Sequence, residues 1–412
     1  MPPPPPGTRL RWASLPEDLI GQIARRVLAG DLLDYVRLRA VCPHWRRSAP
    51  SPRGRGIADP RFHPRRWMML PEGHGLHPGP TKLRGHVRFF NLSTGAVVRA
   101  RLDPLFRDHC ALDSVEGLLL LQRDHDGAVR LLHPFTGDVA EFPPLATLRP
   151  YVNLVESDQR CHARKICAAS ISVDSSADEA VTVMMLLPVT TRAAFATSGD
   201  QRWRVSSWSV NQIFRPLPFQ GKLYLFRQSS SPYSGPEVLE ISPPQQEGTD
   251  LILLPPKSIA QSPASSDNFL HRLVECDSEI LMVTSDFAPD KKVSVYRLAD
   301  LALERIAPLT SIGGNSLFVV SVCVSSKAFP AVVGDTIVFT QYNRRYLLQY
   351  DLSSGIVSPA TDVYTGGCST LDPLNILYHI FTCCYRQLWN KGQIMFQGVP
   401  KGWRVKRKWR QG

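Results

Sequence analysis

The chain has 412 residues, of which 43% are hydrophobic and 20% charged, with a formal net charge of +12 at pH 7. A chain of this length and hydrophobicity buries a large core in about two or three domains, which excludes a disordered protein. Nine scattered cysteines and the absence of an apolar signal-peptide core predict a reducing compartment, the nucleus or the cytoplasm. The longest apolar runs, such as 181–189, are too short to span a bilayer, so we expect no membrane contact.

The positive charge is concentrated at the two ends of the sequence. Residues 1–66 contain thirteen Arg and five acidic residues, and residues 386–412 contain eight Lys or Arg and no acidic residue. The net charge is therefore +8 at each end and −4 between them. A nucleic-acid-binding domain carries its basic residues as a folded patch interleaved with aromatic residues, so we do not expect nucleic acid as a partner.

The clearest helical periodicity lies between residues 14 and 47. Ser14 followed by Glu17 has the spacing of a capping box, which predicts the start of a helix, and Gly30 predicts its end. Between these signals an apolar residue recurs every four positions, at Leu15, Leu19, Ile23 and Val27. The pattern predicts one amphipathic helix of about three or four turns.

Two shorter helices are predicted after it. Asp31 and Asp34 open the second helix, and Pro43 ends it and starts the third. Their apolar positions are Leu38, Val41, Cys42 and Trp45. About forty residues remove too little surface from water to bury three apolar stripes, so the excess apolar surface predicts a partner.

The segment LPEDLIGQIARRVLAGDLLDYVRLRAVCPHWRR, with its Leu-Pro start and its Val-Cys-x-x-Trp-Arg end, resembles the F-box. The resemblance implies a three-helix F-box over residues 12–48 that binds a Skp-type adaptor and, through it, a cullin. The residues it implies for adaptor binding are Leu15, Pro16, Leu19, Ile23, Val27, Leu38, Val41, Cys42 and Trp45. The alternative is a helical cap that packs only on its own C-terminal domain. We interpret Arg25, Arg26, Arg46 and Arg47 as a solvated face.

Three segments have compositions without periodicity. Residues 1–11 are Pro-rich and predicted to be disordered, and residues 49–66 are rich in Pro, Gly and Arg, which predicts an extended basic linker. Residues 386–412 form a basic C-terminal tail. This tail is either solvated or a nuclear-import signal formed by Lys401, Arg404, Lys406, Arg407, Lys408 and Arg410.

One strand pattern recurs between residues 67 and 385. A short strand opens after a small turn residue, and a second strand closed by a polar turn follows about sixteen to nineteen residues later. Clear copies start at Gly117, Gly221, Ser278 and Gly334, which lie 104, 57 and 56 residues apart. Because 104 is two steps of 52, we expect a weaker copy near residue 169, and a first copy starts near residue 67.

A period of about 50 residues is typical of propeller blades, so we predict a mainly β protein with a β-propeller of six or seven blades. Asn91, His133 and Asp351 each precede a Gly by four residues, which predicts hairpin tips. The alternative of two stacked β-sandwiches conflicts with the regular period. The motifs FFNLSTG, GLLLL, SKAFPAVVGDTIVF and QYDLSSG resemble the plant-type KIB propeller domain found behind F-boxes.

We find no catalytic, cofactor or metal motif in the sequence. Cys161 and His162 with Cys167, and the pair Cys383 and Cys384, lack the paired spacings of a zinc site. This absence fits what the resemblance to the F-box implies: a non-catalytic substrate-recognition subunit of a Skp-cullin-F-box type ubiquitin ligase, with no cofactor. The alternative is a stand-alone propeller that binds a protein, sugar or metabolite and carries a vestigial F-box.

Overall fold

The structure is a computed structural model. It describes residues 12–69, 86–102, 109–123, 125–148, 150–151, 168–174, 180–187, 190–210, 214–228, 234–248, 250–263, 269–286, 293–318, 322–330, 332–340, 347–360, 377 and 380. The Pro-rich N-terminus, the C-terminal tail with its six candidate import residues, and Cys161, His162, Cys167, Cys383 and Cys384 lie outside these ranges. Within them, no helix combines the length and the apolar character needed to cross a membrane.

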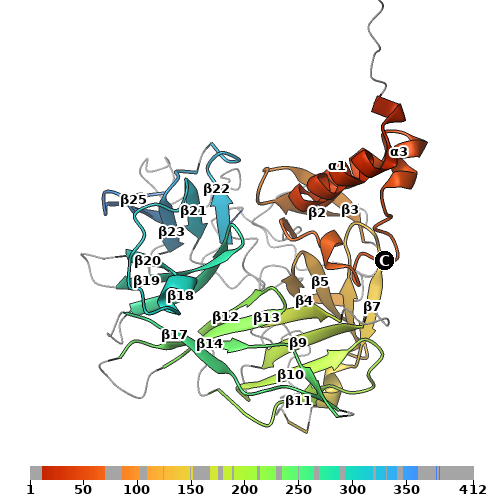
Figure 1. Ribbon diagram of the computed structural model, residues 1–412. Coiled ribbons are helices and arrows are strands. Elements are labelled where there is room, and N and C mark those ends of the chain that lie inside the picture. The colour runs from red at the N-terminus through yellow and green to blue at the C-terminus, as the bar shows by residue number, and fades with distance from the viewer. Residues whose placement is uncertain are drawn as a thin grey trace, which may run out of the picture.

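Six β-sheets surround a common centre and form a six-bladed β-propeller, with the N-terminal helices beside β2 and β3 (Figure 1). We number the sheets as blades 1 to 6 in chain order. Blade 1 contains β1 (Trp67–Met69), β2 (His86–Asn91) and β3 (Val97–Arg101). Blade 2 contains β4 (His109–Val115), β5 (Leu118–Arg123), β6 (Val129–Leu132) and β7 (Val139–Phe142). Blade 3 contains β8 (Ala168–Val173), β9 (Val181–Leu187), β10 (Arg192–Thr197) and β11 (Arg204–Val205).

The remaining blades follow the same antiparallel plan with local additions. Blade 4 contains β12 (Phe214–Phe219), β13 (Lys222–Arg227), β14 (Glu237–Ile241) and β17 (Lys257–Gln261), with the separate hairpin β15 (Gln245–Glu247) and β16 (Asp250–Ile252). Blade 5 contains β18 (Phe269–Cys276), β19 (Glu279–Asp286) and β20 (Val293–Arg297), followed by α5 (Leu298–Leu301). Blade 6 contains β21 (Asn315–Phe318), β22 (Val322–Ser325), β23 (Thr336–Thr340), β24 (Leu347–Asp351) and β25 (Val357–Pro359), in which β21 and β23 pair in parallel.

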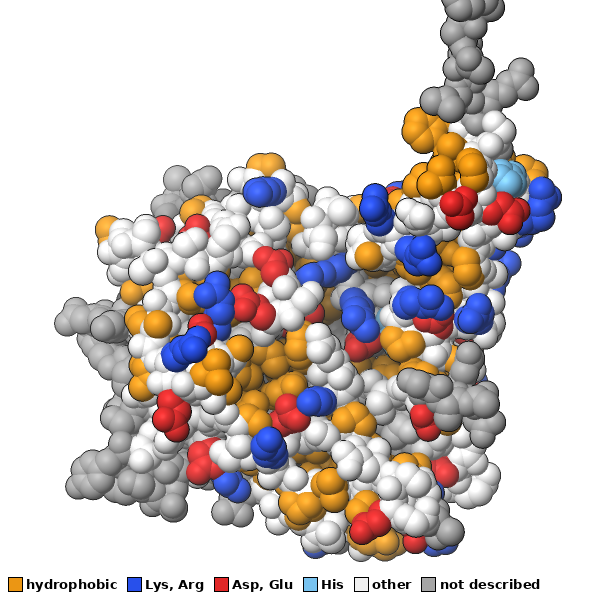
Figure 2. All heavy atoms as spheres, in the orientation of Figure 1, with side chains coloured by type: hydrophobic (Ala, Val, Ile, Leu, Met, Phe, Trp, Pro, Cys, Tyr) orange, Lys and Arg blue, Asp and Glu red, His pale blue; other side chains and the backbone are white. Residues whose placement is uncertain are grey.

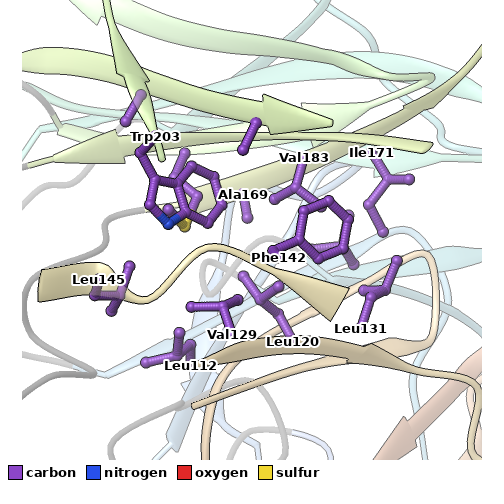
Figure 3. Packing of buried hydrophobic residues seen from close by; sticks show 14 of the residues in the cluster. Leu112, Leu120, Val129, Leu131, Phe142, Leu145, Ala169, Ile171, Val183 and Trp203 are labelled. Carbon is purple, nitrogen blue, oxygen red and sulfur yellow. The ribbon is translucent and has the colours of Figure 1, made fainter. Parts of the chain in front are cut away.

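The core lies between neighbouring blades, so both faces of a sheet are covered. In β5, Leu118 and Leu120 face blade 3, whereas Leu119 and Leu121 face blade 1. This explains the unbroken leucine run after Gly117, because a strand buried on both faces needs no polar alternation. Between blades 2 and 3 the rings of Phe142 and Trp203 stack with centroids 6.2 Å apart (Figure 3).

The ring closes where blade 1 meets blade 6. Phe90 of β2 packs in one cluster with Phe318, Val338 and the C-terminal residues Leu377 and Ile380. The prediction of a mainly β propeller is confirmed, and the blade number is six. The expected weaker repeat near residue 169 is β8, which starts at Ala168. The alternative of two β-sandwiches is wrong, because the described strands form six blade sheets around one centre, besides the small β15–β16 hairpin.

The three predicted hairpin tips share one hydrogen-bonded turn. Asn91 Oδ1, His133 Nδ1 and Asp351 Oδ1 each accept from the backbone N–H groups two and three residues later. The Gly four residues later has a positive φ in all three turns: Gly95, Gly137 and Gly355. The prediction of hairpin tips is therefore confirmed at β2–β3, β6–β7 and β24–β25.

The N-terminal helices are η1 (Trp12–Ser14), α1 (Glu17–Gly30), α2 (Leu32–Arg39) and α3 (Pro43–Ser48). The helix start differs from the prediction, because Pro16 rather than Ser14 occupies the N-cap of α1 and Ser14 belongs to the preceding 3-10 turn. Asp31 does cap α2, as predicted, since its carboxylate accepts from the N–H groups of Leu33 and Asp34. Pro43 starts α3 as expected.

Residues 49–66 are not the extended linker that their composition predicts. They contain the 3-10 turn η2 (Pro60–Phe62), and Ile57, Phe62 and His63 are buried. The N–H groups of Gly54 and Gly56 donate to the carboxylate of Asp138 in blade 2. Specific contacts with the propeller, rather than charge repulsion, determine the path of this segment. A further 3-10 turn, η3 (Leu145–Leu148), follows blade 2.

A candidate protein-interaction surface on the N-terminal helices

Residues 12–48, the helical module, form a small apolar core with the segment that follows them. The buried side chains of this core are Ile20, Ala24, Leu32, Tyr35, Leu38, Trp45, Ala49 and Phe62. The module does not complete this core alone, since Phe62 comes from η2 and Phe135 of blade 2 packs against it. The helices therefore bury one face against the rest of the chain and leave the opposite face available.

The residues predicted to bind an adaptor occupy three levels of burial. Leu38 and Trp45 are buried in the module core. Leu15, Ile23, Val27 and Cys42 are half-buried at its edge. Pro16, Leu19 and Val41 are exposed. The structure thus brings the predicted residues onto one small module, but only the second and third groups can contact another molecule without unfolding it.

The buried face of α1 is not the predicted stripe. Ile20 and Ala24 face inward, and Leu19 beside them is 42% exposed. A step of four residues rotates by 40° beyond a full turn of a 3.6-residue helix, so a stripe of three such steps winds off the inner face. The alternative spacing Ile20, Ala24 and Val27, with steps of four and three, was the sequence signal for the buried side.

Large apolar side chains are exposed at the outer end of the helical module. Trp12, Val41 and Leu19 are 69%, 60% and 42% exposed. Figure 2 shows hydrophobic side chains gathered on the part of the module farthest from the sheets. Trp12 lies outside the predicted stripe and was missed, although its backbone is fixed because its carbonyl accepts from Trp45 Nε1 at 2.9 Å. We call Trp12, Leu15, Leu19, Ile23 and Val41 the outer apolar surface.

Asp31 connects the helical module to blade 1. One carboxylate oxygen caps α2, and the other accepts from Trp67 Nε1 at 2.7 Å and from Asn91 Nδ2 at 2.8 Å. Trp67 lies in β1, and Asn91 ends β2 at a hairpin tip. A single carboxylate therefore joins a helix terminus to two strands and fixes the module against the propeller.

Further contacts link the module to blade 2 through residues 49–66. Tyr35 donates its hydroxyl to the carbonyl of Pro50 at 2.7 Å, and burial raises the pKa of that hydroxyl. His133 Nε2 donates to the carbonyl of Phe62 at 3.0 Å. Burial lowers the pKa of His133, which matches the two N–H groups that its Nδ1 accepts. These bonds connect the module to blade 2 through residues 49–66.

An ion cluster fixes the same segment at the turn between β4 and β5. His63 Nδ1 lies 2.6 Å from Glu116 Oε2, and Arg65 approaches that oxygen at 3.2 Å. Burial opposes ionisation of Glu116, but the His63 and Arg65 partners outweigh it and lower the pKa of the carboxyl.

On the module, the side chains of Arg25, Arg26, Arg46 and Arg47 are exposed, in agreement with a solvated face.

The described part of the propeller shows no group of three His, Cys, Asp or Glu side chains that could hold a metal ion. A family model described as KIB1-4 beta-propeller matches residues 89–365. A search of curated proteins finds no match.

Similar solved structures include a catalytically inactive virginiamycin B lyase from Staphylococcus aureus with quinupristin. Its sequence is 8% identical, and the superposition covers 67% of this chain and 76% of the lyase chain with a TM-score of 0.27. A second similar structure is the N-terminal domain of Nup159, which is 10% identical. This superposition covers 65% of the present chain and 70% of the Nup159 chain, with a TM-score of 0.21. Neither likeness is close enough to support a functional argument.

Proposed function

Because the chain belongs to the KIB1-4 beta-propeller family, we propose that it is the substrate-recognition subunit of a Skp-cullin-F-box type ubiquitin ligase. The helical module docks a Skp-type adaptor, and the propeller binds the target protein. Following the resemblance to plant F-box proteins, we place this activity in the nucleus or cytoplasm of a plant cell.

The observation that carries the proposal is the outer apolar surface on a module that is otherwise well packed. Trp12, Leu19 and Val41 expose apolar side chains on the helical module, and no described element covers them. Hydrophobic side chains gather on the part of the module farthest from the sheets (Figure 2). Burying such side chains is worth about 25 cal/mol per Å² of apolar area, which favours a protein partner over water. An apolar helical face that meets a groove is a recurring mode of protein recognition.

The rigid connection through Asp31 supports a positioning role. A ligase receptor works by holding a target near an enzyme bound elsewhere, so a fixed angle between the two binding parts reduces the entropy lost on reaction. The contacts of Asp31, Tyr35 and His133 supply that fixed angle. The proposed chemistry of this chain is therefore recognition and orientation, and the bond-forming steps take place on other subunits.

A second candidate is a stand-alone propeller whose helices serve only as a cap. The sharing of Phe62 and Phe135 between module and propeller favours it, because a cap also packs on its own domain. It gives no account of the exposed Trp12, Leu19 and Val41 side chains.

Size-exclusion chromatography with light scattering separates the two candidates. The purified full chain is mixed with a purified Skp-type adaptor, and the ligase proposal predicts one complex with one copy of each protein. Separate elution of the two proteins at micromolar concentration would favour the stand-alone propeller. Addition of cullin to the complex then tests whether the assembly extends to the ligase.

A second experiment separates adaptor binding from target binding. The full chain and its Leu19→Asp variant are captured from cells in which ligase turnover is blocked, and the bound proteins are quantified by mass spectrometry. The proposal predicts that adaptor and cullin are lost from the variant while propeller-bound proteins stay. Equal recovery of adaptor and cullin on both chains would contradict it.

A further inference from the structure

Two cysteines from neighbouring blades meet in the core between blades 5 and 6. Cys276 is the last residue of β18, and Cys323 lies in β22. Both are free thiols, and they are 3% and 7% exposed. They belong to a single apolar cluster that includes Val274 of blade 5 and Ile337 of blade 6.

The two sulfur atoms are 2.6 Å apart, although the residues are 47 positions apart in the sequence. A disulfide requires a sulfur separation of about 2.05 Å, so the two thiols already lie close to bonding distance. A second bridge holds the same two blades together, because Asn315 Nδ2 of β21 donates to Asp277 Oδ2 at 2.7 Å. The fold therefore brings the thiols together before any oxidation.

We propose that Cys276 and Cys323 form a redox-sensitive modification site, an interblade dithiol that a peroxide converts to a disulfide. In the first step one sulfur, as its thiolate, attacks the peroxide, so that a sulfur–oxygen bond forms while the oxygen–oxygen bond breaks. In the second step the other sulfur, after losing its proton, displaces water from the sulfenic acid. Two electrons pass from the thiols to hydrogen peroxide, and both oxygens and both thiol protons leave as two molecules of water.

The surroundings determine which oxidant reaches the pair. Both sulfurs are buried, but Cys276 directly precedes the turn at Asp277 and Ser278, and strand ends open more readily than strand centres. Hydrogen peroxide is small enough to enter through such an opening, whereas glutathione disulfide is not. The neighbouring sulfur and burial raise the pKa of Cys323, which slows ionisation of this thiol and therefore its reaction with oxidants.

The disulfide would lock blades 5 and 6 together. It would close the loop from residue 276 to residue 323, which contains β19, β20 and β21. Constraining a loop of this length lowers the entropy of the unfolded chain, so oxidation stabilises the folded propeller. This inference concerns the propeller alone and does not depend on adaptor binding.

Peptide mapping of the full chain tests the bond directly. The reduced protein is treated with hydrogen peroxide, alkylated and digested with trypsin without reductant. Cleavage after Lys or Arg places Cys276 in peptide 273–291 and Cys323 in peptide 306–327, and neither peptide has another cysteine. We expect these two peptides linked to each other, and separate again after dithiothreitol. Linkage to a different cysteine, or separately alkylated peptides after peroxide has oxidised Cys42, would overturn the proposal.

Thermal unfolding tests the consequence. Oxidised wild-type protein should have a melting temperature higher than the reduced form by roughly 4 °C or more. Cys323→Ser should lose this shift, and Cys42→Ser, at a half-buried thiol on the helical module, should keep it. A linked pair without a shift would contradict the locking of the two blades. If Cys323→Ser does not fold, Cys276→Ala replaces it, and the peptide mapping needs no variant.

Discussion

Replacing Asp31 with Asn separates the two tasks of this carboxylate. Asn is as good a helix N-cap as Asp, so Oδ1 can still accept from Leu33 and Asp34. The other position then carries an NH₂ donor that faces the N–H groups of Trp67 and Asn91. The substitution therefore removes the connection to blade 1 and leaves the cap of α2 in place.

The expected cost follows from the number of bonds lost. A hydrogen bond to a charged group contributes about 1.5–3 kcal/mol, and two are replaced by opposed donors, so Asp31→Asn should destabilise the chain by about 3 kcal/mol or more. The matched control is Asp34→Asn in the same helical turn, where the exposed ion pair with Arg37 contributes about 0.5 kcal/mol or less.

Urea unfolding monitored by tryptophan fluorescence measures both variants. With a slope of about 3 kcal/mol per M, the midpoint of Asp31→Asn should fall by about 1 M and that of Asp34→Asn by less than about 0.2 M. Amide hydrogen exchange should increase in residues 17–48 of Asp31→Asn, because the module is released from the propeller. Equal midpoints and unchanged exchange for Asp31→Asn would refute the assigned role of this carboxylate.

Two further predictions concern the contact between residues 49–66 and the propeller. Gly117 has φ +82°, and a Cβ added there would lie 2.0 Å from the carbonyl oxygen of Pro64. At Gly137, φ is +81° and a Cβ would meet no atom within 4 Å. Gly117→Ala should therefore lower the melting temperature far more than Gly137→Ala. A similar loss in both variants would mean that strain alone, and not the close approach, decides the effect. His133 has a folded-state pKa below its ordinary 6.5, so its stabilising contribution is complete above pH 6.5 and is lost as the pH falls through the lower value. In His133→Asn the new side-chain oxygen can accept the turn N–H groups, as Asn91 Oδ1 does in blade 1, but it does not titrate. The free energy of unfolding of this variant should therefore fall less steeply between pH 7 and pH 5 than that of wild type. An unchanged slope would exclude His133 as the titrating group.

The propeller could be predicted from the sequence because its signals are local and repeated. The leucine run after Gly117, the turn residues Asn91, His133 and Asp351, and the period of about 50 residues each depend on neighbouring positions. The sequence predicted less well which side of α1 is buried, because apolar residues spaced by four wind around the helix. The structure placed Ile20 and Ala24 inside and left Leu19 outside.

Contacts between distant residues explain what the sequence could not show. Residues 49–66 have the composition of a linker, yet Asp138 binds the N–H groups of Gly54 and Gly56 from 84 and 82 positions away. Asp31 was recognisable as a helix cap, but its bonds to Trp67 and Asn91 bridge 36 and 60 positions. The Trp12 carbonyl likewise accepts from the indole N–H of Trp45, 33 positions away.

The affinity of the full chain for a Skp-type adaptor tests the proposed function most directly. Leu19→Asp places a charge in the proposed contact between the helical module and the adaptor. It does not disturb the module core, because Leu19 is already exposed. The matched control is Ile356→Asp, another exposed apolar residue, which lies in blade 6 away from the helices. By isothermal titration calorimetry we predict that Leu19→Asp weakens binding at least roughly 100-fold, about 2.7 kcal/mol, at an unchanged melting temperature, and that Ile356→Asp binds like wild type. Wild-type affinity in Leu19→Asp, or no adaptor binding by the wild-type chain, would contradict the proposal.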